Sequence, residues 1–335
     1  MTASIYILFV LALNLLFLLT YKYLSVKLNI FDEPDKKIKI HKKPIPLLGG
    51  IFIYCNICLF FVFILIFREN FRPDIFTSNK SLFNFFFFST ALFIIGFLDD
   101  KIKISANLKF FSFFVLILIA VLIDKNFILE ILNFSFYKKE IFLENFSILF
   151  TVFCIVLFIN AFNMFDGINC QASLYAIFLI LILGINGLDI NLLTTFLIPL
   201  LVILFLNFQN KIFLGNSGSY LLPFVFSLLY ILSYNSKFFK ADEILLIFLF
   251  PGLDMFRLFI TRLSKKNNPF LGDKNHIHHL VLEKTNSNLT TILFTVILPI
   301  SFYFVYVYSD INNLYFLTGI ICYYLVLYLN SKKNK

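Results

Sequence analysis

Long apolar segments alternate with short polar ones along the whole chain. Eleven of the apolar segments are close to the roughly 20 residues that an α-helix needs to cross a bilayer. They cover residues 3–21, 47–67, 82–98, 108–123, 146–163, 171–187, 192–208, 219–235, 242–261, 290–308 and 313–330. The pattern predicts an all-α polytopic membrane protein with ten or eleven transmembrane helices, built as one domain over residues 1–335.

Two segments need a separate interpretation. The first apolar segment is too long for a signal-peptide core and has no basic start or clear cleavage site, so we expect a retained span. The weakest pattern lies at 124–145. There ILNFSFYKKEIFLENFS is typical of a short amphipathic or hairpin segment on one face of the membrane.

The composition supports a membrane protein, because 60% of the 335 residues are hydrophobic and only 14% are charged. A net charge of +9 would also suit a nucleic-acid-binding protein. Cytoplasmic lysines that face anionic lipid explain it better, and we expect no nucleic acid partner. The five cysteines lie in or beside apolar segments, so we expect buried thiols rather than a redox or metal site.

The polar loops differ by parity when they are numbered in order. The odd loops hold most of the Lys and Arg, and they cover residues 22–46, 99–107, 164–170, 209–218 and 262–289. Positive charge marks the cytoplasmic face, so we expect these loops and the C-terminus inside and the N-terminus outside. All four histidines and every unusual polar motif lie in or beside these loops. They are therefore the predicted catalytic loops.

The first odd loop leads into the motif FDEPDKKIKIHKKPIPLLGG. It mixes Asp32 and His41 with several lysines, and Gly49 and Gly50 let the backbone come close to another group. A basic segment that only fixes the topology is the alternative interpretation.

The second motif, GFLDDKIKISANLK, ends a predicted span with Asp99 and Asp100. Carboxylates are costly at a membrane boundary, and two neighbours raise each other's pKa unless a cation neutralises them. With Lys109 further along, the pair predicts a Mg²⁺ or phosphate site. A solvated helix end is the alternative.

The third motif is NAFNMFDGINC. Asn160, Asn163 and Asp166 recur every three residues, on one side of a helix that we expect to end at Gly167. Such a polar stripe is expected to face a polar cavity rather than lipid, and Asn169 follows where it can read a base edge. Hydrogen bonding between helices is the alternative, and it accounts best for Asn160.

The fourth motif, FLGNSGSYLL, starts a span at residues 213–222. Phe213 offers a ring for stacking, the glycines permit close approach, and free N–H groups at the helix start suit a phosphate. An ordinary Gly-Ser turn before a span is the alternative.

The fifth motif begins inside a span, where Asp254 and Arg257 are spaced to pair at i,i+3. A polar segment follows, with its acidic and imidazole side chains at Asp273, His276, His278 and His279. Clustered histidines can bind zinc, but no thiolates accompany them and the nearby lysines favour a pyrophosphate or sugar ligand. A polar loop without function is the alternative. Together the five motifs predict one site where a nucleotide diphosphate meets a membrane lipid.

The order and spacing of these motifs resemble those of the polyprenyl-phosphate N-acetylhexosamine-1-phosphate transferases. The resemblance is strongest to the WecA/TagO-like branch, with MraY more distant, and it is carried by Asp32–Gly50, GFLDD, NAFNMFDGIN, FLGNSGS and PFLGDKNHIHH. It implies transfer of a sugar-1-phosphate from a UDP-N-acetylhexosamine, most commonly UDP-GlcNAc, to a polyprenyl phosphate such as undecaprenyl phosphate. UMP is the second product.

The resemblance also implies Mg²⁺ as cofactor, with Mn²⁺ an alternative, and the first step of a cell-envelope glycan. The site would lie on the cytoplasmic face of a bacterial inner membrane, and a homodimer stays open. A transporter of lipid-linked substrate and an inactive homologue that only binds the UDP-sugar or lipid are the alternative functions.

The motifs and the resemblance assign the site residues. The catalytic group is Asp99, Asp100, Asp166, His278 and His279. The metal ligands are Asp99, Asp100, Asn163 and Asn216. The substrate-binding residues are His41, Gly49, Gly50, Lys109, Asn169, Phe213, Asp273 and His276. Within these sets the resemblance implies that Lys109 holds phosphate and that Asn169 and Phe213 contact uracil.

Two residues depart from the family pattern. Asn216 stands where the family usually has an aspartate that binds the metal, so the position keeps an oxygen but loses a charge. Cys170 stands where a glycine is usual.

Overall fold

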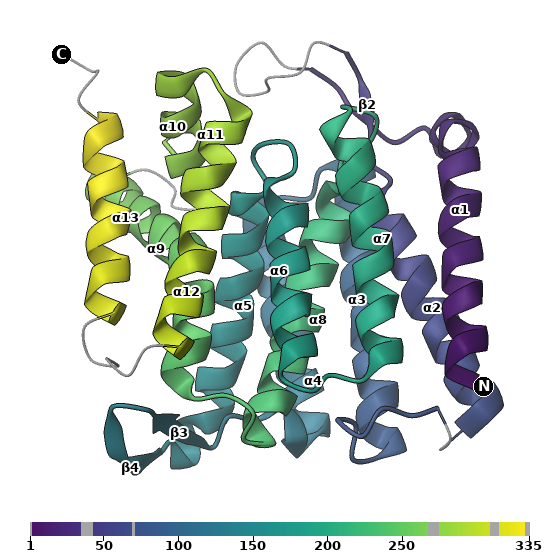
Figure 1. The fold of residues 1–335 in the computed structure, drawn as a ribbon, viewed down its shortest axis with the longest axis horizontal. Helices are drawn as coiled ribbons and strands as arrows, with labels where there is room; N and C mark the ends of the chain where they lie inside the picture. The colour runs from purple at the N-terminus through teal and green to yellow at the C-terminus, as the bar shows by residue number, and fades with distance from the viewer. Residues whose placement is uncertain (1, 35–42, 69–70, 267–274, 309–314, 332–335) are drawn as a thin grey trace.

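The computed structural model describes residues 2–34, 43–68, 71–266, 275–308 and 315–331 (Figure 1). All eleven apolar segments form helices. Their bounds are α1 Thr2–Leu28, α2 Gly49–Phe67, α3 Asn79–Ile102, α4 Ala106–Ile123, α5 Ser147–Phe165, α6 Gln171–Ile185, α7 Ile190–Phe208, α8 Gly215–Asn235, α9 Ala241–Ser264, α12 Leu298–Tyr308 and α13 Tyr315–Ser331. The short helices α10, Ile277–Thr285, and α11, Asn288–Ile292, come before α12, and a π-helical turn at Leu293–Ile297 joins α11 to α12.

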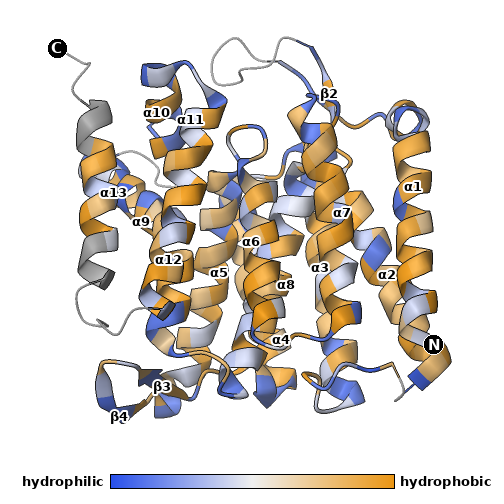
Figure 2. Ribbon diagram, in the orientation of Figure 1, coloured by the Kyte–Doolittle hydropathy of each residue, from blue (hydrophilic) through white to orange (hydrophobic). Residues whose placement is uncertain are grey.

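Membrane-spanning length is shared by most of these helices. In the described part of the chain, nine helices are long and apolar enough to cross a membrane. The shorter α6 has 15 residues and α13 has 17. The protein is therefore a polytopic membrane protein, as the apolar pattern predicts. Figure 2 shows the hydrophobic residues along the middle of the bundle and the hydrophilic ones toward its two ends.

The structure is mostly helical, in keeping with the predicted all-α class, and two small antiparallel sheets are present besides the helices. Strand β1, Phe31–Asp32, pairs with β2, Ile45–Pro46. Strand β3, Ile131–Phe134, pairs with β4, Tyr137–Phe142, which confirms the hairpin interpretation of residues 124–145. All six residues of β4 are exposed, so this two-stranded ribbon lies on the surface of the protein.

Helix α8 forms the centre of the bundle. Every residue from Ser217 to Tyr234 is buried, and α2, α3, α5 and α6 all contact it. Small residues make this packing close. A Cβ on Gly96 of α3 would lie 2.5 Å from the Ser217 Cα, so a larger residue would push the two helices apart.

The two ends of the bundle differ in content. Strand β2, the α5–α6 loop and helices α10 and α11 lie at one end, which we call the motif end (Figure 1). The start of α1 and the β3–β4 hairpin lie at the other end. The polar motifs of the odd loops thus gather on one side of the apolar belt.

Candidate active site

The polar start of α8 is held by a carboxylate from another helix. Asp100, in the last turn of α3, accepts hydrogen bonds from the N–H groups of Asn216 at 2.7 Å and Ser217 at 3.0 Å. The first N–H groups of a helix have no partner within it, and the helix dipole favours a negative charge there. Asp100 therefore caps α8 and fixes the start of α8 against the end of α3.

The glycines of this region serve this packing. Gly215 has φ +74°, and a Cβ there would lie 2.9 Å from Asp100 Oδ2. A Cβ on Gly50 would lie 2.1 Å from the backbone nitrogen of Gly218. Gly49 and Gly50 donate their N–H groups to the carbonyls of residues 213 and 214, at 3.0 and 2.9 Å. The group that the glycine pair approaches is therefore the 213–218 segment, and neither glycine lines the cavity described below.

The first loop reaches the same place through its short sheet. Strand β2 continues into a bridge between Leu47 and Phe213, and the Phe213 N–H donates to the Pro46 carbonyl at 2.8 Å. Asp32 pairs with Ile45 across the sheet. This pairing carries Asp32 to the side of Phe213.

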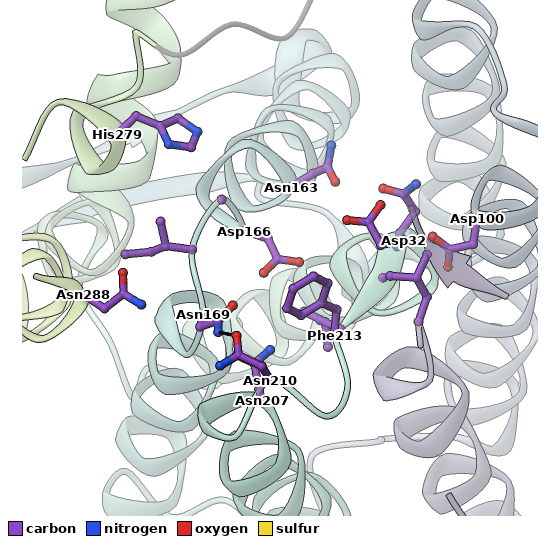
Figure 3. Close-up of a pocket in the computed structure, with 16 residues that line it drawn as sticks. Asp32, Asp100, Asn163, Asp166, Asn169, Asn207, Asn210, Phe213, His279 and Asn288 are labelled. Atoms are coloured by element: carbon purple, nitrogen blue, oxygen red, sulfur yellow. Dashed lines mark hydrogen bonds between the residues drawn. The ribbon is translucent and has the colours of Figure 1, made fainter. Parts of the chain in front are cut away.

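A polar cavity of about 380 Å³ opens among these elements at the motif end (Figure 3). Its walls come from loops that are far apart in the sequence. The lining polar and aromatic side chains are Asp32, Asp100, Asn163, Asp166, Asn169, Asn207, Asn210, Phe213, Asn216, His279 and Asn288. Three carboxylates, six amides, one imidazole and one phenyl ring thus surround a single space.

The adjacent aspartates face different partners. Asp99 is 3% exposed and pairs with Lys109 Nζ at 3.0 Å. It also accepts from the Tyr220 hydroxyl at 2.7 Å and from the Ile104 N–H at 2.7 Å. Neighbouring residues on a helix point about 100° apart, so they cannot share one ligand easily. Only Asp100 of the predicted pair lines the cavity, and Asp99 and Lys109 lie behind it.

Helix α5 ends at Phe165, two residues before the predicted end at Gly167, and Asp166 follows it directly. Burial raises the pKa of Asp166 to about 7, and the negative charges of Asp100 and Asp32 act in the same direction. Asn163 lies one turn earlier and accepts a hydrogen bond from Ser219 Oγ at 2.8 Å. Asn160 does not line the cavity, and it donates to the carbonyl of residue 156 in its own helix. This bond is not the hydrogen bond between helices that the alternative interpretation of Asn160 expects.

Asparagine side chains join the α5–α6 loop to the α7–α8 loop near Phe213. Asn169 Nδ2 donates to Asn210 Oδ1, and Asn207 Oδ1 accepts from the Cys170 N–H. Asn207 Nδ2 donates to the Ile212 carbonyl at 2.9 Å. The α5–α6 and α7–α8 loops therefore form one wall, with Asn169 and Asn210 on its cavity side.

Cys170 has φ +70° and ψ −14°. Glycine adopts this left-handed conformation freely, while in a residue with a Cβ the side chain crowds the backbone and raises the energy. The departure from glycine at this position therefore stores backbone strain beside the cavity.

The three histidines have different surroundings. His279, on α10, lines the cavity. His278 is fully buried, and a Cβ on Gly167 would overlap its ring. Burial, with the neighbouring imidazoles, holds the pKa of His278 well below its usual range, so the ring is neutral. His276 faces Asp254, with Nδ1 and Oδ2 2.9 Å apart. It does not line the cavity. The predicted substrate contacts His41 and Asp273 lie outside the described residues.

Known proteins are similar in sequence to this chain over most of its length. The model of glycosyl transferase family 4 matches residues 82–234. An undecaprenyl-phosphate alpha-N-acetylglucosaminyl 1-phosphate transferase from Escherichia coli O157:H7 is 30% identical over 281 residues, which are 80% of this chain and 73% of that protein. The chain belongs to glycosyl transferase family 4.

Relatives from other bacteria give the same result. A protein of that name from Yersinia pestis is 28% identical over 298 residues, which are 84% of the present chain and 77% of the relative. One from Thermotoga maritima is 29% identical over 295 residues, which are 84% and 86% of the two chains. The chain is thus a membrane transferase of family 4 type.

The oxygen atoms that line the cavity suit Mg²⁺ as a ligand set. Carboxylate and amide oxygens are hard ligands, and Mg²⁺ typically takes one or two carboxylates together with waters and substrate phosphates. Asp166, Asn163 and Asn216 offer such oxygens. The Asn163 oxygen also accepts from Ser219, and both Asp100 oxygens accept from α8. Among the described residues no three His, Cys, Asp or Glu side chains converge as a ready-made metal cluster. The walls of this family 4 cavity therefore fit a cation that substrate phosphates help to hold.

Four cavity residues were missing from the predicted set: Asp32, Asn207, Asn210 and Asn288. Asn207 carries a weak signal, because it is a polar residue in the last turn of a predicted span. Asp32 belongs to the first motif but was given no role. Asn210 and Asn288 lie in polar loops, where nothing in the sequence distinguishes a lining residue from a solvated one.

Proposed function

We propose that this chain transfers N-acetylhexosamine-1-phosphate, with GlcNAc as the sugar, from the UDP-sugar to undecaprenyl phosphate. The acceptor phosphate oxygen forms a bond to the sugar-bearing phosphorus of the donor. The bond from that phosphorus to the UMP oxygen breaks, and UMP leaves. The observation that carries the proposal is the polar cavity at one end of a membrane bundle, in a family whose named relatives use undecaprenyl phosphate.

The charges of the cavity suit two anionic substrates only with a cation present. When bound, Mg²⁺ would offset the repulsion between the two substrates and the charge that develops on UMP. Asp166 and the amide oxygens of Asn163 and Asn216 would hold it. Without the cation, burial holds the pKa of Asp166 near 7, so a proton would compete with the cation for this carboxylate at neutral pH.

The nucleoside end of the donor fits the Phe213 side of the cavity. The Phe213 ring offers an apolar face, and the Asn169–Asn210 pair beside it offers donors and acceptors for a base edge. His279 and Asn288 line the opposite side, as Figure 3 shows, where the sugar and its phosphate would lie.

The acceptor tail fits a second, apolar cavity of about 430 Å³ between α5, α8 and α9. Its lining includes Cys154, Phe158, Ala161, Ile231, Phe248 and Gly252. Helix α5 runs from this cavity to Asn163 and Asp166 of the polar one. A prenyl chain that lies here therefore presents its phosphate toward the polar cavity. The Lys and Arg bias of the odd loops supports a cytoplasmic position of that cavity.

The test is UMP release by the purified full-length chain with Mg²⁺, undecaprenyl phosphate and a panel of UDP-sugars. We expect UMP with UDP-GlcNAc, little without the lipid, and at least a 100-fold loss in Asp166→Asn. Donor binding without UMP from any sugar would refute the transferase and favour a binding homologue.

A further inference from the structure

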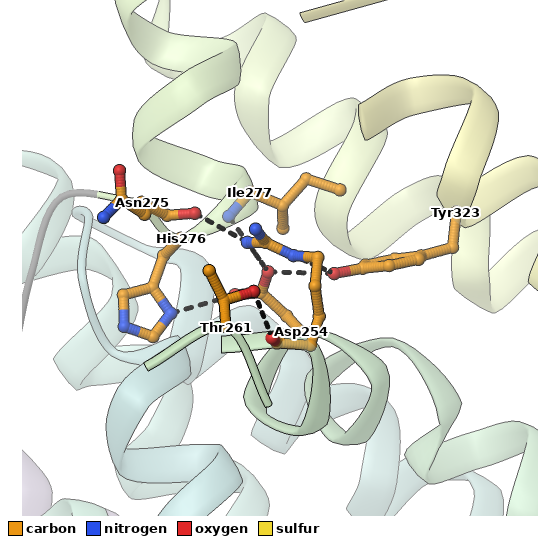
Figure 4. A network of polar contacts seen from close by, with 7 residues as sticks. Asp254, Thr261, Asn275, His276, Ile277 and Tyr323 are labelled. Atoms are coloured by element: carbon orange, nitrogen blue, oxygen red, sulfur yellow. Dashed lines mark hydrogen bonds and ion pairs between the residues drawn. The ribbon is translucent and has the colours of Figure 1, made fainter. Parts of the chain in front are cut away.

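A buried polar cluster joins α9, α10 and α13 (Figure 4). Its centre is Asp254 of α9, which is 3% exposed. One carboxylate oxygen accepts from Arg257 Nη2 at 2.7 Å, from the Tyr323 hydroxyl at 3.0 Å and from the Ile277 N–H at 3.2 Å. The other oxygen faces His276 Nδ1 at 2.9 Å.

Arg257 extends the cluster. Its Nε donates to the Tyr323 hydroxyl at 3.0 Å, and its Nη2 donates to the Asn275 carbonyl at 2.6 Å. A buried ion pair of this kind is weak evidence for stability, because desolvation offsets most of the attraction. It does fix geometry, since each partner must stay in place to keep the buried charge satisfied.

The bonds act on the first residues of α10. Asn275, His276 and Ile277 are all held by the cluster, and His279 lines the cavity less than one helical turn later. Ile277 and Val281 also pack with Tyr323 in a small apolar core. The position of His279 is thus tied to residues of two other helices.

We propose that Asp254, Arg257 and Tyr323 form a latch that positions α10, and with it His279, over the cavity. None of the three lines the cavity, so they are positioning residues. No described residue of α13 lines the cavity, so α13 acts on it through this latch. The inference rests on the proposed transferase function, because it assigns His279 a place at the donor phosphates or sugar.

The latch is separate from the nucleoside wall. Phe213, Asn169 and Asn210 belong to the α5–α6 and α7–α8 loops. Their hydrogen bonds run to each other, to neighbouring loop residues, to β2 and to the start of α2. Loosening α10 therefore leaves the donor's base held while His279 leaves its place. The expected kinetic signature is a lower kcat with little change in KM.

The test compares Tyr323→Phe with Tyr324→Phe in the full-length protein. The first change removes the hydroxyl that bonds Asp254 and Arg257, and it keeps the ring that packs on Phe250. Tyr324 is the next residue of α13, and it is 51% exposed. We expect about a tenfold lower kcat in Tyr323→Phe, KM for UDP-GlcNAc within about threefold, and faster hydrogen exchange at the α10 amides. Tyr324→Phe should match the wild type in all three.

A neutral version of the latch gives a second arm. Asp254→Asn combined with Arg257→Gln leaves no unpaired buried charge, so it is expected to fold. It should lower kcat as well, and adding Tyr323→Phe should then cost less than about twofold more. Equal kcat in both tyrosine variants, lost turnover with unchanged α10 exchange, or full additivity would each overturn the latch. If the wild type releases no UMP, the transferase proposal fails, while the exchange comparison still reports on the latch.

Discussion

The contact between Gly215 and Asp100 makes a quantitative prediction for Gly215→Ala. The left-handed φ of +74° costs a residue with a Cβ roughly 1–2 kcal/mol. The new Cβ would lie 2.9 Å from Asp100 Oδ2, so the carboxylate must withdraw from the first turn of α8. Its bonds to the N–H groups of Asn216 and Ser217 then weaken, and a hydrogen bond to a charged group contributes about 1.5–3 kcal/mol.

We therefore expect Gly215→Ala to lower the free energy of unfolding by about 3–5 kcal/mol. UMP release should fall by about 100-fold, because a carboxylate on the cavity wall moves by a large fraction of an ångström. Unfolding in detergent micelles and initial rates of UMP release measure the two effects on the same preparation.

Gly187→Ala provides the matched control. Gly187 has φ +92°, but its Cβ would meet only a Phe238 ring carbon at 3.7 Å, in ordinary contact. This variant carries the backbone strain alone, about 1–2 kcal/mol, and should keep its activity. If the two alanine variants lose equal stability and Gly215→Ala stays active, Gly215 has no special role in seating Asp100.

Three further predictions concern the departures from the family and the titration of the site. Asn216→Asp adds a carboxylate to the cavity wall, so activity should reach half its maximum at about tenfold lower Mg²⁺; an unchanged or higher Mg²⁺ requirement would refute residue 216 as a ligand. Cys170→Gly should change the free energy of unfolding by less than about 1 kcal/mol, because the relief of backbone strain offsets the lost burial of the side chain. Cys170→Val should lower the free energy of unfolding by at least about 2 kcal/mol. If the backbone at residue 170 were free of strain, the glycine variant would be the less stable of the two. The raised pKa of Asp166 means that the folded chain binds its proton more tightly than the unfolded one. Stability should fall as pH rises from about 4 to about 7, while the rate at low Mg²⁺ should rise through pH 7. Asp166→Asn should weaken the stability trend, which other buried carboxylates share, and should remove the rise in UMP release.

Features set by local spacing are the ones that the sequence predicts well. Apolar length places the helices, and the i,i+3 spacing of Asp254 and Arg257 gives an ion pair that the structure confirms at 2.7 Å. The same local geometry explains the divergence of Asp99 and Asp100, since adjacent helical residues point in different directions. The sequence predicts one site for both carboxylates, whereas in the structure Asp100 lines the cavity and Asp99 pairs with Lys109.

Features set by tertiary contacts are not visible in one sequence. Asp32 enters the cavity only because β1 and β2 pair, and Asn288 only because α11 folds beside α10. His276 illustrates the reverse case. It belongs to a motif whose neighbour His279 lines the cavity, yet its own ring is engaged by Asp254 from a different helix. The role of each histidine depends on which helix packs against α10, and spacing along the chain does not contain that information.

The start of α8 shows why a substitution at residue 216 is compatible with an intact site. Asp100 reaches this turn through the main-chain N–H groups of residues 216 and 217, and Gly50, Gly96 and Gly215 clear the space around it. A backbone donor does not depend on the side chain that follows it. An asparagine in place of an aspartate at position 216 therefore leaves the cap, the packing of α3 on α8 and the position of Asp100 unchanged. The exchange alters only the charge that residue 216 presents to the cavity, so its effect should be confined to cation affinity.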